Sequence, residues 1–159
     1  MKLQAFLTVA QRAIAMLETA QPLAQAAARL YVAQAFFLSG LTKLRDWNIT
    51  LALFQDEYQV PLLSPAVAAV AGTTGELVLP VLLALGLAGR FAAAGLSIVN
   101  LVAVVSLAEI AAPALQQHVF WGSLLLGLLL WGPGRWSLDR FVLPWLQRQS
   151  STAAYTRAT

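Results

Sequence analysis

Long stretches of apolar residues, separated by short polar or proline-containing segments, dominate the pattern along the chain. Four of them approach the length of about 20 residues that a helix needs to cross a bilayer. They cover residues 23–44, 66–88, 91–113 and 114–131. Lipid offers the backbone no hydrogen-bond partners, and the alternation typical of barrel strands is absent. The pattern therefore predicts an all-α protein, an antiparallel four-helix transmembrane bundle.

A different apolar pattern precedes these stretches. Leu3, Phe6, Ala10, Ile14 and Leu17 recur at helical spacing, with polar residues largely on the other side. This predicts an amphipathic helix that lies on the inner leaflet and is separated from the first span by Pro22. The predicted organisation is an interfacial helix at 1–21, a membrane domain at 22–147 and a polar cytoplasmic tail at 148–159.

The segment between the first two spans carries its own helical signal. Trp47, Leu51, Phe54 and Tyr58 form one apolar face, and Pro61 ends the pattern. We expect a short helix at the outer interface. It either anchors the chain there or covers the outer mouth of the bundle as a lid.

Composition supports a membrane protein embedded in a lipid bilayer. The chain has 159 residues, of which 59% are hydrophobic and 11% charged, whereas soluble domains are about 45–50% apolar and about 25% charged. This excludes a soluble globular domain and a disordered chain. We expect no nucleic-acid partner. With no cysteine and one histidine, one copy cannot form disulfides, thiolate or multi-histidine metal sites, so no metal site is expected.

The distribution of basic residues predicts the orientation. One end of the predicted bundle carries most of the lysines and arginines. They are Lys2, Arg12, Arg29, Arg90, Arg135, Arg140, Arg148 and Arg157. At the other end, nearby acidic residues offset the positive charges of Lys43 and Arg45. The positive-inside rule therefore places the N- and C-termini in the cytoplasm.

Each predicted span carries one polar residue at a similar depth. These residues are Gln34, Glu76, Asn100 and Ser123. A charged residue at the bilayer centre costs about 2.5–3.5 kcal/mol on insertion scales, so Glu76 must face the bundle and be protonated or partnered. Pro80 cannot donate to the Glu76 carbonyl, and Gly72 and Thr73 lie one turn earlier. A polar site at this depth is therefore expected.

Counting residues along the spans ranks the partners of Glu76. Gln34 and Asn100 are level with it, and Arg29 lies about 7.5 Å of helical rise below Gln34. Lys43 is expected to lie too far outward, by about 13 Å of rise. Three interpretations stay open: a buried hydrogen-bond network that fixes packing, a pocket for a substrate or quinone headgroup, and a proton path. Catalytic residues are not predicted.

A second cluster is expected at the outer end. Lys43 ends the first span, Glu109 ends the third and His118 begins the fourth. A His–Glu pair there could titrate or relay protons. Alternatively, His118 is an interfacial hydrogen-bonding residue.

Several segments resemble the DoxX family of small four-span membrane proteins. They are Arg29-Leu30, Phe36 to Leu44, Gly75-Glu76-Leu77, Leu82 to Leu87, Gly132-Pro133-Gly134 and Ser137-Leu138-Asp139. The resemblance implies a multi-pass protein of the bacterial inner (cytoplasmic) membrane. Some members are membrane subunits of sulfur- or thiol-linked redox systems, including thiosulfate:quinone oxidoreduction, whereas most have no established activity. The family provides no catalytic residues that transfer to this chain.

The loop from Asp46-Trp47 through Glu57-Tyr58-Gln59-Val60-Pro61-Leu62-Leu63 resembles one subgroup of that family. Its members tend to be encoded beside non-haem iron enzymes that modify cysteines of small secreted, copper-related peptides. The first functional hypothesis is therefore an accessory component of a redox or copper-peptide maturation system, working with a soluble or membrane partner protein. The alternatives are a quinone-handling oxidoreductase subunit and a small homo-oligomeric transporter or exporter. Whether the protein is an enzyme stays open.

Overall fold

The computed structural model describes residues 2–142, 144 and 145, and this part of the chain is all-helical. The helices are α1 (Lys2–Arg45), α2 (Trp47–Asp56), α3 (Pro65–Leu85), α4 (Gly89–Val105) and α5 (Ala112–Trp131). Within these described residues there is no strand, only an isolated antiparallel bridge between Tyr58 and Leu107. The all-α class expected from the sequence is confirmed, and the predicted tail at 148–159 lies outside the described residues.

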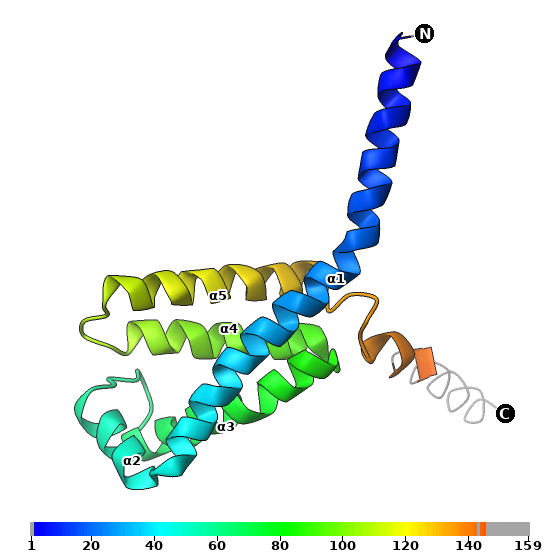
Figure 1. Cartoon of the computed structure of the whole chain (residues 1–159). Helices are drawn as coiled ribbons and strands as arrows, with labels where there is room; N and C mark the ends of the chain where they lie inside the picture. The colour runs from blue at the N-terminus through cyan, green and yellow to red at the C-terminus, as the bar shows by residue number, and fades with distance from the viewer. Residues whose placement is uncertain (1, 143, 146–159) are drawn as a thin grey trace, which may run out of the picture.

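The C-terminal part of α1 packs with α3, α4 and α5 around a shared apolar core. Figure 1 shows α4 and α5 side by side, α1 crossing them, and α2 folded against the N-terminal part of α3. The core consists of Val32, Phe36, Leu83, Ala92, Ala93, Leu96, Leu125 and Leu128. A second, smaller cluster, in which Phe54 packs on Ala68 and Ala69, attaches α2 to α3.

The predicted separation at Pro22 is wrong, because α1 is one helix from Lys2 to Arg45 with Pro22 inside it. Proline removes one backbone hydrogen bond and bends a helix without having to end it. Figure 1 shows the dark-blue N-terminal part projecting away from the bundle at an angle to the rest of α1. The side chains of residues 11–21 are all exposed, so the described part of the chain leaves their apolar face uncovered.

The third span is shorter than expected. The helix ends at Val105 rather than near Pro113, because the chain turns at Ser106 to meet the segment after α2. There the N–H of Gln59 donates to the Ser106 carbonyl at 2.7 Å. Among the described residues, Pro65–Leu85 and Ala112–Trp131 are long and apolar enough to cross a membrane, and Gly89–Val105 is apolar but shorter.

The outer surface of the helices is rich in large apolar side chains. On α3, α4 and α5 the exposed residues include Val67, Val70, Val78, Val81, Phe91, Ile98, Leu101, Val105, Val119, Leu126, Leu130 and Trp131. By contrast, Arg29, Glu76 and Asn100 are among the buried residues. Exposed apolar patches of this extent mark interaction with a membrane or another protein.

The turn between α3 and α4 organises the end of the bundle opposite α2. Gly86 adopts a left-handed conformation with φ 64° and ends α3. The Asp139 carboxylate accepts hydrogen bonds from the N–H groups of Ala88 and Gly89 at 2.7 and 2.8 Å, which caps α4. Arg29 is buried beside this turn, and its Nη2 donates to the Trp136 carbonyl. The second and third apolar stretches are therefore separated by a tight turn at residues 86–88.

We predict that Gly86→Ala strongly destabilises the fold. A Cβ atom at this position would collide with Arg29 Nη1 and Ser137. The left-handed conformation alone costs a non-glycine residue about 1–2 kcal/mol. The control is Gly127→Ala in α5, where the nearest atom lies 3.4 Å from the new Cβ and alanine should gain about 0.5–1 kcal/mol. Unfolding in mixed micelles measures both, and equal stability of the two variants would contradict the prediction.

Candidate ligand-binding site

A lysine–glutamate ion pair lies where α1 crosses α3. Lys43 Nζ is 2.6 Å from Glu76 Oε2, with side chains only 17% and 10% exposed. Lys43 Nζ also donates to Ser39 Oγ at 3.0 Å. An ammonium group has three N–H donors, so these two contacts leave one for another partner. The expectation that Glu76 is buried and partnered is therefore met, by a residue that sequence reasoning had placed elsewhere.

The exclusion of Lys43 as a partner was wrong because the assumed register between the helices was wrong. A Cβ atom on Gly40 would lie 3.1 Å from Glu76 Cβ, so Gly40, not Gln34, is level with Glu76. The difference is six residues, or about 9 Å of helical rise. Lys43 follows Gly40 by three residues, about 4.5 Å of rise, which its long side chain spans. The N-terminal part of α3 extends beyond this crossing and packs on α2 instead.

The ion pair borders a largely apolar cavity of 210 Å³. The wall is formed by Lys43, Phe54, Tyr58, Val60, Leu63, Ala68, Ala71, Gly72, Glu76, Ile98, Val99, Val102, Ala103 and Ser106. Pockets for drug-sized ligands are about 300–1,000 Å³, so this cavity has room for a small headgroup. A few convergent polar groups in an apolar cavity are typical of a binding site.

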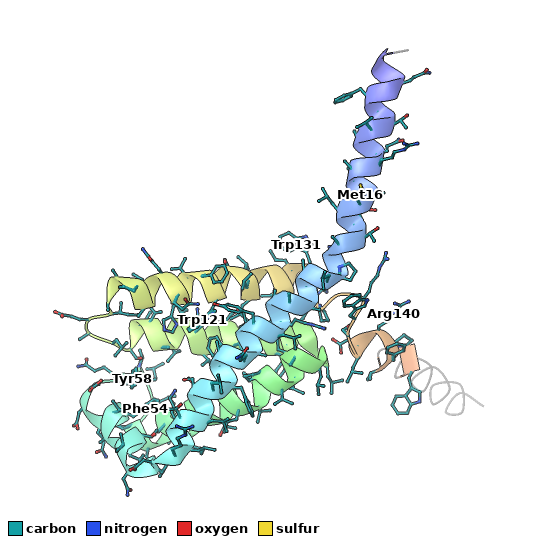
Figure 2. The ribbon with its side chains drawn as sticks, in the orientation of Figure 1. Met16, Phe54, Tyr58, Trp121, Trp131 and Arg140 are labelled. Carbon is teal, nitrogen blue, oxygen red and sulfur yellow. The ribbon has the colours of Figure 1, made fainter. Side chains whose placement is uncertain are left out.

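Helix α2 and the segment after it cover the cavity. The Asp46 side chain caps α2 by accepting from the Ile49 N–H at 3.0 Å, and Thr50 Oγ1 donates to the Lys43 carbonyl at 2.8 Å. Figure 2 shows Phe54 and Tyr58 next to each other on the side of α2 that faces α4, with ring centroids 5.0 Å apart. The short helix expected at residues 47–58 is confirmed, and it lies over the cavity.

Tyr58 lies in the segment after α2 that covers the cavity, and its phenol group can ionise. Burial raises the pKa of its phenol above the ordinary value, and the negative charges of Glu76 and Glu57 raise it further. The phenol therefore stays protonated at neutral pH and keeps an O–H donor at the cavity wall. Sequence reasoning used Tyr58 only as part of an apolar helix face and missed Ser39 and Ser106. The spacing of Ser39 and Lys43, one turn apart on α1, was the available signal.

Asn100 and His118 pair with each other instead of joining Glu76 or Lys43. Asn100 Nδ2 donates to the His118 carbonyl at 3.0 Å, so its Oδ1 accepts from His118 Nδ1 at 2.8 Å. The His118 ring lies edge-on to Trp121, with centroids 5.2 Å apart. These contacts join α4 to α5. Of the two interpretations of His118, the structure shows the hydrogen-bonding one.

The remaining predicted residues are dispersed. Gln34 and Ser123 are exposed on the outside of α1 and α5, and Glu109 is exposed beyond α4. Thr73 is buried, and its hydroxyl has no partner within the described residues. Arg29 lies at the opposite end of the bundle beside Trp136. The structure therefore brings together neither the layer of Gln34, Glu76 and Asn100 nor the cluster of Lys43, Glu109 and His118.

The chain matches the model of a known protein family. The family model DoxX matches residues 24–109, just over half of the chain. This range contains every residue of the cavity wall, whereas α5 and the Gly132–Asp139 segment lie outside it. No curated protein matches, and neither does any solved structure.

We predict strong energetic coupling between Lys43 and Glu76. Removing one partner of a buried pair costs about 3–5 kcal/mol, because the other charge is left uncompensated, whereas replacing both with apolar residues is often neutral. Glu76→Leu and Lys43→Met should each be strongly destabilising, and the double variant should recover to within about 1 kcal/mol of wild type. A double-mutant cycle of unfolding in micelles measures the coupling. A double variant as unstable as the sum of the single ones would contradict it.

We also predict that Tyr58 ionises at higher pH than an exposed tyrosine. The ultraviolet phenolate spectrum, taken as the difference between wild type and Tyr58→Phe, isolates its titration. Because its pKa is raised by folding, the neutral phenol stabilises the fold below the unfolded value of about 10. That stability is lost as pH rises through the folded pKa. Glu57→Gln should lower the midpoint, and a midpoint at or below that of free tyrosine would refute the assignment.

Proposed function

Because the chain belongs to the DoxX family, we propose that it is a membrane component of a redox system whose cavity binds the headgroup of a quinone. Family membership and the apolar helices suggest a membrane protein, with some relation to oxidoreductases. The observation that carries the finer proposal is the Lys43–Glu76 pair at the wall of an apolar cavity. Such a site suits a ligand with an apolar ring and polar oxygens.

The proposed placement in the bilayer uses α1, α3, α4 and α5 as four spans. Their outward faces carry exposed apolar residues, which lipid would cover. The 21 residues of α3 extend about 32 Å, close to the hydrocarbon thickness of about 30 Å. The basic residues Arg29, Arg90, Arg135 and Arg140 lie at or near the Gly86 end, which supports a cytoplasmic position for that end. The cavity then lies toward the outer side.

The wall groups match the atoms of a quinone ring. Quinone carbonyl oxygens are hydrogen-bond acceptors, and the cavity-lining residues Lys43 and Tyr58 each carry a donor group. Phe54, Val99 and Val102 provide apolar surface for the ring. A bound quinone would supply two-electron, two-proton redox chemistry.

Lys43 and Glu76 have complementary tasks in this proposal. The Lys43 ammonium donates a hydrogen bond to a quinone oxygen while Glu76, 2.6 Å away, holds its charge in place. The chain has no cysteine and one histidine, so we assign the delivery of electrons to a partner protein.

The test is quinone binding by the purified protein in lipid nanodiscs. Short-chain ubiquinone and menaquinone analogues are titrated while tryptophan fluorescence is followed, and retained quinone is extracted and quantified. The Lys43→Met/Glu76→Leu variant, expected to keep its stability, should bind at least about tenfold more weakly, because a hydrogen bond to a charged group contributes about 1.5–3 kcal/mol.

Gln34→Leu is the matched control. Gln34 is exposed on the outside of α1, so its loss should leave quinone affinity unchanged. Absence of quinone binding by the wild-type protein would overturn the proposal, as would wild-type affinity in the Lys43→Met/Glu76→Leu variant.

A further inference from the structure

The seam between α3 and α4 changes in packing along its length. Toward the Gly86 end it is tight: a Cβ atom on Gly75 would lie 3.2 Å from Val99, and one on Gly95 would lie 2.7 Å from a Leu79 methyl. These contacts pair residues 75 with 99 and 79 with 95, which is an antiparallel register. One turn further out, the same register brings Ala71 level with Ala103.

Small residues leave this outer part of the seam unfilled. Ala71, Gly72 and Ala103 line the cavity, whereas Leu79 fills the seam below it and Val99 lies at the boundary, on the cavity wall. A Cβ atom on Gly72 would meet only the Phe54 ring, at 3.5 Å. The cavity is therefore an open stretch of the α3–α4 seam, with the ion pair on its inner wall.

The side of the cavity that faces the outer solution is covered by protein. Phe54 and Tyr58 lie over it, and the chain after α2 is tied to the end of α4 by the bridge from Tyr58 to Leu107 and the hydrogen bond from Gln59 to Ser106. On the outward face of the seam, the cavity-lining residues Ile98 and Ala71 are exposed, Ile98 by 63%. The opening between α3 and α4 is thus apolar on both rims.

We infer that the ligand of this site is a lipid-tailed molecule, which enters from the bilayer between α3 and α4 and leaves its tail in that opening. The inference rests on the proposed function and narrows it to quinones with an isoprenoid tail, in contrast to water-soluble thiols, peptides or metal ions. The headgroup contacts Lys43, and the tail passes between Ala71 and Ile98 into lipid.

The first experiment narrows the opening. Ala71→Phe places a bulky side chain at its rim, whereas Val78→Phe changes an exposed position of α3 that does not line the cavity. Affinities are measured in nanodiscs for a tail-less dimethoxy-benzoquinone and for the same ring with an isoprenoid tail. Ala71→Phe should weaken the tailed quinone about tenfold, by steric overlap. The tail-less ring and the Val78→Phe control should keep wild-type affinity.

The second experiment does not depend on a quinone. The chain has no cysteine, so Ala71→Cys provides a single site for a spin label in nanodiscs. Its relaxation by oxygen, which concentrates in lipid, and by a water-soluble nickel chelate reports its surroundings. Val78→Cys provides the lipid reference and Gln55→Cys, on the exposed polar side of α2, the water reference. The label at position 71 should behave like that at position 78.

The outcomes separate the two proposals. Equal weakening of both quinones by Ala71→Phe, unchanged binding of the tailed quinone, or a water-like label at position 71 would each overturn lateral entry and leave the headgroup site standing. Failure of the wild-type protein to bind either quinone would overturn the proposed function and this inference with it.

Discussion

The contact between Lys43 and Glu76 is the constraint around which the part of the molecule near α2 is organised. Two opposite charges withdrawn from water must stay paired, because a single buried charge is far more costly than the pair. The pair fixes where α1 crosses α3, and the close approach of Gly40 to α3 makes that crossing possible. The backbone carbonyl of Lys43 also accepts a hydrogen bond from the Thr50 hydroxyl. The same residue therefore positions the ion pair and the helix that covers it.

Much of the fold follows from patterns within single segments of the chain. The apolar face of α2 and the apolar length of α3 and α5 each depend on neighbouring residues, and these features were predicted. Relations between helices were not. The prediction assumed that all spans begin at the same depth, which placed Gln34 beside Glu76. In the structure, Gly40 is the residue of α1 that lies beside Glu76. Hydropathy cannot detect this offset, because a shift of six residues leaves an apolar stretch apolar. The free-energy cost of a charge in lipid was enough to predict that Glu76 faces the other helices and has a partner. It did not identify that partner.

The end of α4 shows a different limit of sequence reasoning. Residues after Val105 remain apolar up to Pro113, apart from Ser106 and Glu109, so hydropathy continues the helix. In the structure the chain leaves the helix at Ser106 because the segment after α2 binds its backbone. A tertiary contact thus decides a secondary-structure boundary. It also moves Glu109 away from Lys43 and His118, which removes the basis for the outer cluster inferred from span ends.

The two ends of the bundle use their polar residues differently. At the Gly86 end, Asp139 caps α4 and Arg29 contacts the Trp136 carbonyl, so the charges hold backbone segments together, near the point where α1 changes direction (Figure 1). At the α2 end, Lys43 and Glu76 contact each other and a cavity, with small residues of α3 and α4 leaving space beside them. Packing a leucine or valine where Ala71, Gly72 and Ala103 stand would add apolar contacts, as it does one turn below. The seam between α3 and α4 is filled at Gly75 and Gly95 but left open beside the ion pair, so it lacks apolar contacts at that one place. We assign this loss of packing to ligand binding.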